Sequence, residues 1–176
     1  MKTTEKSKSK GTPLDNKIEN PKPIELNSLF DENECGFILP DEWFTDPQQI
    51  ANENRLDFIL PINSKKVLDN IGTDKNKARL KFAVLEKNAT NHKELSADDS
   101  RLILDAVLNL SDNGKIIMNK GDKPFYRLLI HVEDLSATAR IDLRGIRNEV
   151  EIIGWHWMRA TDRDSNLSKA IKEKQN

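Results

Sequence analysis

Three side chains in this sequence are suited to acid–base and phosphate chemistry. His92 lies in the polar stretch NATNHKEL, Arg101 lies near the start of the next apolar run, and Tyr126 is the only tyrosine. Cleavage of RNA by its own 2′-hydroxyl needs a base, a cation for the charged phosphorane and an acid, and these residue types fill such roles. We take His92, Tyr126 and Arg101 as candidate catalytic residues. The alternative is that a histidine in a linker is structurally incidental.

Other kinds of reactive site have no motif in this sequence. Neither His131 nor His156 belongs to a zinc-binding spacing. There is no phosphate-binding glycine loop and no Gly-x-Ser-x-Gly turn, and the single cysteine, Cys35, has no neighbours that mark it as a nucleophile. We therefore expect chemistry that needs neither a metal nor a cofactor.

Four segments after Gly114 alternate between apolar and polar side chains, which is typical of β-strands. They span residues 114–120, 125–134, 136–145 and 148–158 and are joined by turn residues. Successive side chains of a strand point to opposite faces, so one face of this sheet is apolar and the other is polar. The polar face is expected to bind RNA phosphates and to stack on bases through Arg127, His131, Arg140, Arg144, Trp155 and Trp157.

The stretch VEIIGWHWMR belongs to the last predicted strand, and its alternation determines which of its side chains lie on the polar face. Strict alternation sends His156 to the apolar face, with Val150 and Ile152, and sends both tryptophans to the polar face. The alternative is that opposite charges on neighbouring strands are simple cross-strand pairs and that the tryptophans lie half-buried under a terminal helix.

Helices are expected before the sheet. SKKVLDNIG predicts a short helix capped by Ser64 and closed by Gly72. Residues 80–87 and 96–113 show helical periodicity, and the second run opens with a Ser-x-x-Asp capping box. The polar tail predicts a final, weakly amphipathic helix. The predicted fold class is α+β, with N-terminal helices packed on a four-stranded antiparallel β-meander and a C-terminal helix.

Charge is distributed unevenly along the chain. Of its 176 residues 36% are hydrophobic and 32% are charged, with a net charge of -1. Residues 1–24 hold six lysines and three acids, whereas residues 25–60 hold nine acids and one arginine. We divide the chain into a disordered basic tail (1–28), an acidic segment with aromatic anchors (29–57) and an α+β domain (58–172).

Composition also limits the cellular compartments in which the protein is expected. One cysteine excludes an intramolecular disulfide framework, and no apolar run approaches the roughly 20 residues that a membrane helix needs. The N-terminus has basic residues without the hydrophobic stretch of a secretory signal. We expect a soluble, cytoplasmic protein without a membrane partner.

The order of elements and several motifs resemble a known nuclease group. NHKEL before RLILDAVLNL, followed by NGKII, KPFYRLLIHV and VEIIGWHWM, is similar to phage and mobile-element nuclease domains of the barnase/EndoU/colicin/RelE-like (BECR) superfamily. The resemblance covers roughly residues 60–170 and implies an α+β fold with metal-independent RNase activity. By position it carries His92, Tyr126, Arg101 and Trp155 into the candidate site. The chain lacks a clear further strand after VEIIGWHWM, and that superfamily includes inactive members.

Two function hypotheses remain open. The first is a metal-independent endoribonuclease, toxin-like or encoded by a mobile element, with RNA as its partner. The second is a non-catalytic module that binds nucleic acid, or that binds a protein through the acidic residues 25–60. The acidic residues are also expected to act as an intramolecular strap over the basic sheet face. The sequence does not give the RNA target or the oligomeric state.

Overall fold

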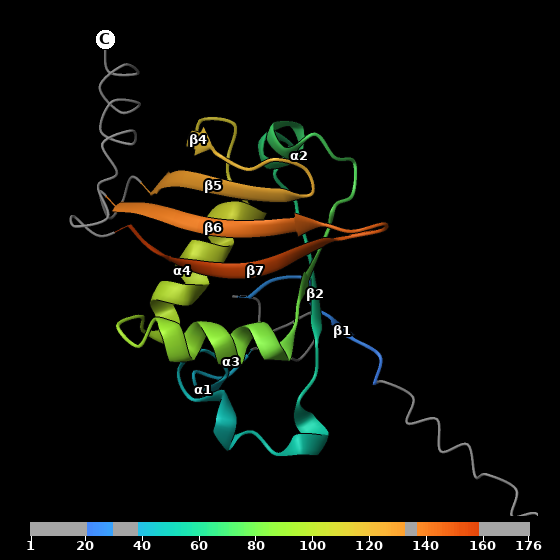
Figure 1. Ribbon diagram of the computed structural model, residues 1–176, viewed down its shortest axis with the longest axis vertical. Helices are drawn as coiled ribbons and strands as arrows, with labels where there is room; N and C mark the ends of the chain where they lie inside the picture. Colours follow the sequence, from blue (N-terminus) through green and yellow to red (C-terminus); the bar gives the residue numbers. More distant parts are fainter. Residues whose placement is uncertain (1–20, 30–38, 133–136, 159–176) are drawn as a thin grey trace, which may run out of the picture.

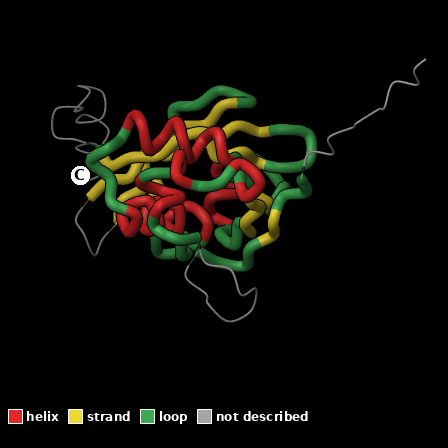
Figure 2. Tube along the Cα trace, turned by 90° about the horizontal axis from the view of Figure 1, so that it is seen from below, coloured by secondary structure: helices red, strands yellow, loops and turns green. Residues whose placement is uncertain are grey.

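A seven-stranded sheet forms the body of the computed structural model, which describes residues 21–29, 39–132 and 137–158 (Figure 1). The strands are β1 (Ile24–Glu25), β2 (Phe58–Pro61), β3 (Lys77–Leu80), β4 (Lys115–Asn119), β5 (Phe125–Val132), β6 (Ala137–Gly145) and β7 (Val150–Trp157). The helices are α1 (Glu42–Thr45), α2 (Lys65–Ile71), α3 (Phe82–Asn91) and α4 (Ala97–Leu108), with 3₁₀ turns at Pro47–Gln49 and Asn52–Asn54. Seen from below, the helices gather beside the strands (Figure 2). Among the described residues, no helix is long and apolar enough to cross a membrane.

β7 is the middle strand of the sheet. The strand order is β1-β2-β3-β7-β6-β5-β4, so β7 joins the three N-terminal strands to the meander of β4, β5 and β6. The pairs β1–β2 and β3–β7 are parallel, and the other neighbouring pairs are antiparallel. Parallel neighbours need a long crossover connection. Between β3 and β7 that connection contains α3, α4 and the whole meander.

The fold class predicted from the sequence is wrong. The structure has a mixed sheet of seven strands with a few short helices, not a four-stranded antiparallel meander behind N-terminal helices. Leu80, predicted to lie in a helix, is the last residue of β3, and a strand of four residues is too short to show its own period. β1 lies within the range 1–28, which the sequence predicts to be a disordered tail, and it pairs with β2. The predicted C-terminal helix falls outside the described residues.

The predicted start and end of α2 are confirmed. The Ser64 hydroxyl accepts a hydrogen bond from the backbone N–H of Val67 at 3.2 Å, and Gly72 follows the helix with a φ of 67°. A side chain at that φ would be strained, so glycine suits the position.

The predicted capping box of α4 is confirmed as well. The Ser96 hydroxyl accepts from the backbone N–H of Asp99 at 3.0 Å, and the Asp99 carboxylate accepts from the backbone N–H of Ser96 at 2.9 Å. These bonds satisfy N–H groups that a first helical turn leaves without partners.

β7 contains a bulge. Ile152 lies opposite Leu143 of β6, but Gly154 lies opposite the preceding residue, Asp142. Ile153 is therefore an extra residue on β7, as in a β-bulge. Beyond it, the residues that face each side of the sheet are exchanged relative to strict alternation.

The bulge overturns the prediction made from VEIIGWHWMR. Trp155 lies opposite the buried Ile141 and is itself 1% exposed, whereas His156 lies opposite Arg140. The predicted placement of Trp155 and Trp157 on an open polar face is wrong, since Trp157 lies opposite the buried Ala139, and so is the placement of His156 on the apolar face. Strict alternation failed because it was carried through an extra residue.

Both tryptophans of this strand bind α4. The indole N–H of Trp155 donates to the Ser100 hydroxyl at 2.9 Å, and that of Trp157 donates to the Asp99 carboxylate at 3.1 Å. Around them the apolar face of the sheet and α4 share one core, with Leu128, Ile130, Leu143, Val150 and Ile152 from the strands and Ile103, Leu104 and Val107 from the helix. α4 is thereby fixed on one face of β5, β6 and β7.

α3 closes the edge of β7 where β3 ends. β3 pairs only with the first three residues of β7. Farther along, the buried Asn88 of α3 accepts a hydrogen bond through Oδ1 from the backbone N–H of Trp155 at 3.0 Å. A buried N–H left without a partner costs about 1–3 kcal/mol, so Asn88 replaces the missing strand at this point.

The described part of the acidic segment belongs to the core. The buried Trp43 lies edge-on to Phe58 and Phe82, with ring centroids 5.0 and 5.4 Å away. α1 contacts α3 and α4, below the sheet in Figure 1. The predicted strap over the basic sheet face is therefore wrong for residues 39–56, because α1 packs against α3 and α4 and the first 3₁₀ turn packs against α3, whereas Asp57 pairs with Arg79 of β3 at 3.6 Å.

We expect the substitution Asn88→Ala to destabilise the protein by about 1–3 kcal/mol, because it leaves the N–H of Trp155 buried and unpaired. Lys87→Ala, at an exposed position of the same helix, is the matched control and should change stability by less than about 0.5 kcal/mol. Urea unfolding measures both variants. Equal unfolding midpoints for the two would contradict the role given to Asn88.

Candidate functional site

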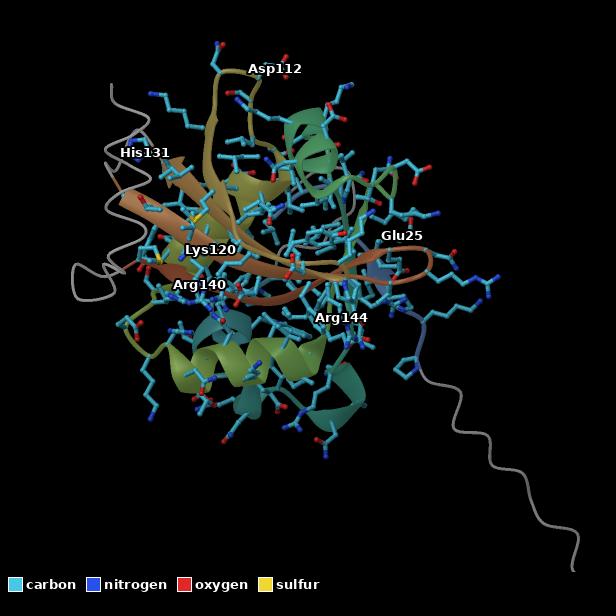
Figure 3. The ribbon with its side chains drawn as sticks, turned by 45° about the horizontal axis from the view of Figure 1, so that its top comes forward. Glu25, Asp112, Lys120, His131, Arg140 and Arg144 are labelled. Carbon is cyan, nitrogen blue, oxygen red and sulfur yellow. The ribbon has the colours of Figure 1, made fainter. Side chains whose placement is uncertain are left out.

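The face of β5, β6 and β7 that turns away from α4 is polar, and we call it the polar sheet face. By register it carries Phe125, Arg127 and His131 of β5, Arg140, Asp142 and Arg144 of β6, and Glu151 and His156 of β7. Figure 3 shows Arg140 and Arg144 over the strands, with His131 farther along. The four basic residues that the sequence assigned to one face thus share it, and their RNA-binding role stays a prediction.

Two arginines share one carboxylate at the centre of this face. The Nε of Arg127 donates to Oδ1 of Asp142 at 2.9 Å, and the guanidinium of Arg140 donates to Oδ2 at 3.1 Å. Burial alone would raise the pKa of Asp142, but the hydrogen bonds from Arg127 and Arg140 outweigh it and hold that pKa below its ordinary value of 3.8. The charged carboxylate fixes both guanidiniums, and the three side chains together keep a net positive charge.

A second group of the same kind surrounds Glu151. Its side chain, 5% exposed, accepts from Lys81 Nζ at 2.6 Å and from the guanidinium of Arg144. Burial would raise the pKa of Glu151, but the hydrogen bonds from Lys81 and Arg144 hold that pKa below its ordinary value of 4.5. Next to it, on β3, Arg79 donates to Glu149 at 2.6 Å. The polar sheet face therefore carries a network of ion pairs, and most of the cations in that network are arginines.

Two histidines stack at the edge of β7. The rings of His92 and His156 lie 4.5 Å apart between centroids, with an interplanar angle of 19°. Nδ1 of His92 lies 3.3 Å from Oε1 of Glu94, and Arg140 lies opposite His156 on the neighbouring strand. Two imidazoles thus lie beside an arginine on the same face. Within residues 21–29, 39–132 and 137–158, no three His, Cys, Asp or Glu side chains gather as a metal site would need.

The other two predicted catalytic residues lie elsewhere. Arg101 is engaged on the helical side, where its guanidinium pairs with Asp41 at 2.7 Å and with Asp98 at 3.0 Å. Tyr126 packs partly against the core, opposite Leu143. Strand geometry puts it roughly 10 Å along the sheet and about two strand spacings of 4.8 Å across from His156. The structure therefore does not bring His92, Arg101 and Tyr126 into one cleft.

Phe125 belongs to this face but is not among the residues predicted from the sequence. This ring is 52% exposed and lies in the same row of the polar sheet face as Arg144. It also borders a surface pocket of about 370 Å³ that Lys120 and Arg127 share. Strand alternation contains the signal, because Phe125 has the same parity as Arg127. The stacking of His156 on His92 could not be predicted in this way, because the bulge in β7 determines the face on which His156 lies.

A family model gives the clearest relationship to known proteins. The model described as large polyvalent protein-associated domain 13 matches residues 33–170. The match runs across residue 57, the predicted boundary between the acidic segment and the α+β domain. No curated protein and no solved structure matches the chain. The phage and mobile-element association that the resemblance implied is thus supported in its general form, while this description assigns no nuclease activity.

We expect the contribution of Glu151 to stability to depend on pH. Its folded-state pKa lies below the unfolded value, so this contribution is fully present above about pH 4.5 and is lost as the pH falls toward the folded pKa. Glu151→Gln should lower the free energy of unfolding by about 1–3 kcal/mol at neutral pH and by less in acid. In acid Glu151 is itself protonated, so the substitution no longer removes a charged partner from Lys81 and Arg144. Urea unfolding at several pH values measures the difference, with the exposed Glu53→Gln as control. A difference that stays constant down to acid pH would refute this assignment.

Proposed function

The chain belongs to the large polyvalent protein-associated domain 13 family, a group of domains associated with phages and mobile elements, and from this premise we propose that it binds nucleic acid through the polar sheet face. One observation carries the proposal. Arg127 and Arg140 are held by the single carboxylate of Asp142, which leaves an excess of positive charge in a fixed position.

Fixed guanidiniums suit phosphate binding. An arginine has five N–H donors, and the bonds to Asp142 use only some of them, so donors remain for phosphate oxygens. The side chain of Arg127 is 44% exposed, so a phosphate can reach its guanidinium without a change in the backbone of the sheet. Because Asp142 already orders these side chains, binding costs less of their conformational entropy.

The whole protein carries a net charge of only -1, so long-range attraction to nucleic acid is weak and the local face must supply the affinity. We expect a dissociation constant of about 10⁻⁴–10⁻⁶ M at physiological salt, the range for binding through phosphates without base readout. The affinity should fall as salt rises.

The first test is Arg127→Gln beside Lys87→Gln, which makes the same charge change at an exposed position of α3. For a labelled single-stranded oligoribonucleotide, Arg127→Gln should weaken binding several-fold and lower the salt slope by roughly 0.7, the value for one phosphate contact. Fluorescence anisotropy over a salt series measures both quantities. Equal affinities for the two variants, with both still folded, would count against the polar sheet face as the binding surface.

We propose RNA cleavage without a metal as a second candidate function, because His92 and His156 stack beside Arg140. One imidazole would take the 2′-hydroxyl proton while that oxygen attacks phosphorus, and the other would give a proton to the departing 5′ oxygen. Arg140 would stabilise the added charge on the phosphorane. Glu94, next to Nδ1 of His92, would hold one tautomer of that ring. The resemblance to BECR nucleases implies the same class of reaction.

This second candidate is tested with RNA in the presence of EDTA. We expect the unmodified protein to cleave, and His92→Ala and His156→Ala each to lose about 10²-fold or more of the rate, as for removal of a general acid or base. Lys87→Ala is the control, because it changes an exposed residue of α3, the helix that ends just before His92, without touching the pair or the polar sheet face. Intact RNA after incubation with the unmodified protein would eliminate cleavage and leave the binding proposal standing.

A further inference from the structure

The pocket at the start of β5 has the composition of a small ligand site. Its volume is about 370 Å³, within the roughly 300–1,000 Å³ of typical ligand sites. Among its lining residues are Lys120 and Gly121 of the β4–β5 connection, Phe125 and Arg127 of β5, and Asp142 of β6. Aromatic, cationic and carboxylate side chains thus border one hollow.

The backbone that carries the Phe125 ring is held in place. The residue is 52% exposed, and the chain is hydrogen-bonded at Phe125 itself and at the preceding Pro124. The backbone N–H of Phe125 donates to the carbonyl of Asp122 at 2.7 Å, and that of Gly145 donates to the carbonyl of Pro124 at 2.7 Å. A large apolar ring held at the surface among charged side chains is suited to stacking against a flat partner.

Gly121 lets the β4–β5 connection form a wall of the pocket. A Cβ on this residue would lie 2.2 Å from the carbonyl oxygen of Phe125 and 2.3 Å from the Cα of Tyr126, closer than any side chain allows. The connection therefore lies directly on β5. The backbone N–H of Lys120 donates to the carbonyl of Arg127 at 3.1 Å, which places the lysine beside the arginine.

The charges of the pocket suit a phosphate next to a flat ring. Arg127 and Lys120 line one hollow with Phe125, and Asp142 lies between the two arginines of the polar sheet face. A phosphate bound to the cations would place the attached sugar and base near the ring. The carboxylate of Asp142 can accept a hydrogen bond from an amino or imino group on the edge of a base.

We propose that this pocket binds one unpaired nucleobase, stacked on Phe125, with its phosphate on Arg127 and Lys120, so that the polar sheet face selects single-stranded over double-stranded nucleic acid. This inference rests on the proposed function and specifies its ligand. A base inside a duplex is already stacked on both faces and cannot cover Phe125, whereas a base in a single strand can. The shared chemistry of base and phosphate occurs in both RNA and DNA.

The test compares Phe125→Ala and Phe125→Trp with the unmodified full chain. Each protein is titrated by anisotropy with a labelled single-stranded RNA, a single-stranded DNA of the same sequence, and the corresponding duplex. Phe125→Ala should weaken binding of at least one single strand about 5- to 100-fold, the usual effect of losing one stacked base. Phe125→Trp should restore it. The more strongly affected strand identifies the source of the base.

Two further readings separate this inference from the proposed function. The salt slope should stay unchanged in Phe125→Ala, because its phosphate contacts remain, whereas Arg127→Gln lowers it. If Phe125→Ala binds every strand like the unmodified protein while Arg127→Gln binds more weakly, the pocket inference is overturned and the proposed function stands. If the unmodified protein binds none of the three nucleic acids, both are overturned. Equal losses for single strands and duplex would also overturn the selectivity.

Discussion

The burial of Trp155 is the interaction on which the rest of the structure depends. Its backbone N–H is held by Asn88 of α3, and its indole N–H is held by Ser100 of α4, so one residue of the central strand fixes both α3 and α4. α3 is kept at the edge of β7 and α4 on one face of the sheet. The opposite face is thereby left for charged side chains. The polar sheet face exists because α4 is held on the other side of the sheet and α3 is held at the edge of β7.

The charged groups of that face order one another. Asp142 and Glu151 stay ionised because each accepts hydrogen bonds from two cations, which offset the cost of burial. An isolated surface ion pair adds little to stability, but groups that share one carboxylate restrict each other's rotamers. The arginines therefore meet a ligand in positions already set, which favours binding more than it favours folding.

Sequence reasoning succeeded where the signal is local. The caps at Ser64 and Ser96 follow from residue types within one turn, and the common face of Arg127 and Arg140 follows from alternation within unbroken strands. It failed where one extra residue, Ile153, reversed the parity of β7 and exchanged His156 with the tryptophans. The strands β1, β2 and β3 have two to four residues each, too few to reveal a period, and their positions depend on distant partners. The contact between His92 and His156 could not be foreseen for the same two reasons.

The place of β7 in the sheet has a consequence for how the molecule forms. β7 is the last described strand in chain order, yet it is the middle strand of the sheet and pairs with both halves. During synthesis on the ribosome, β2 and β3 emerge long before the strand that covers the inner edge of β3. Pairings between segments so far apart are slow to form, and an uncovered strand edge can pair with another chain. Because the contacts of this arrangement join segments far apart in the sequence, the pairing of β7 is the step that joins β1, β2 and β3 to the meander of β4, β5 and β6 in one domain.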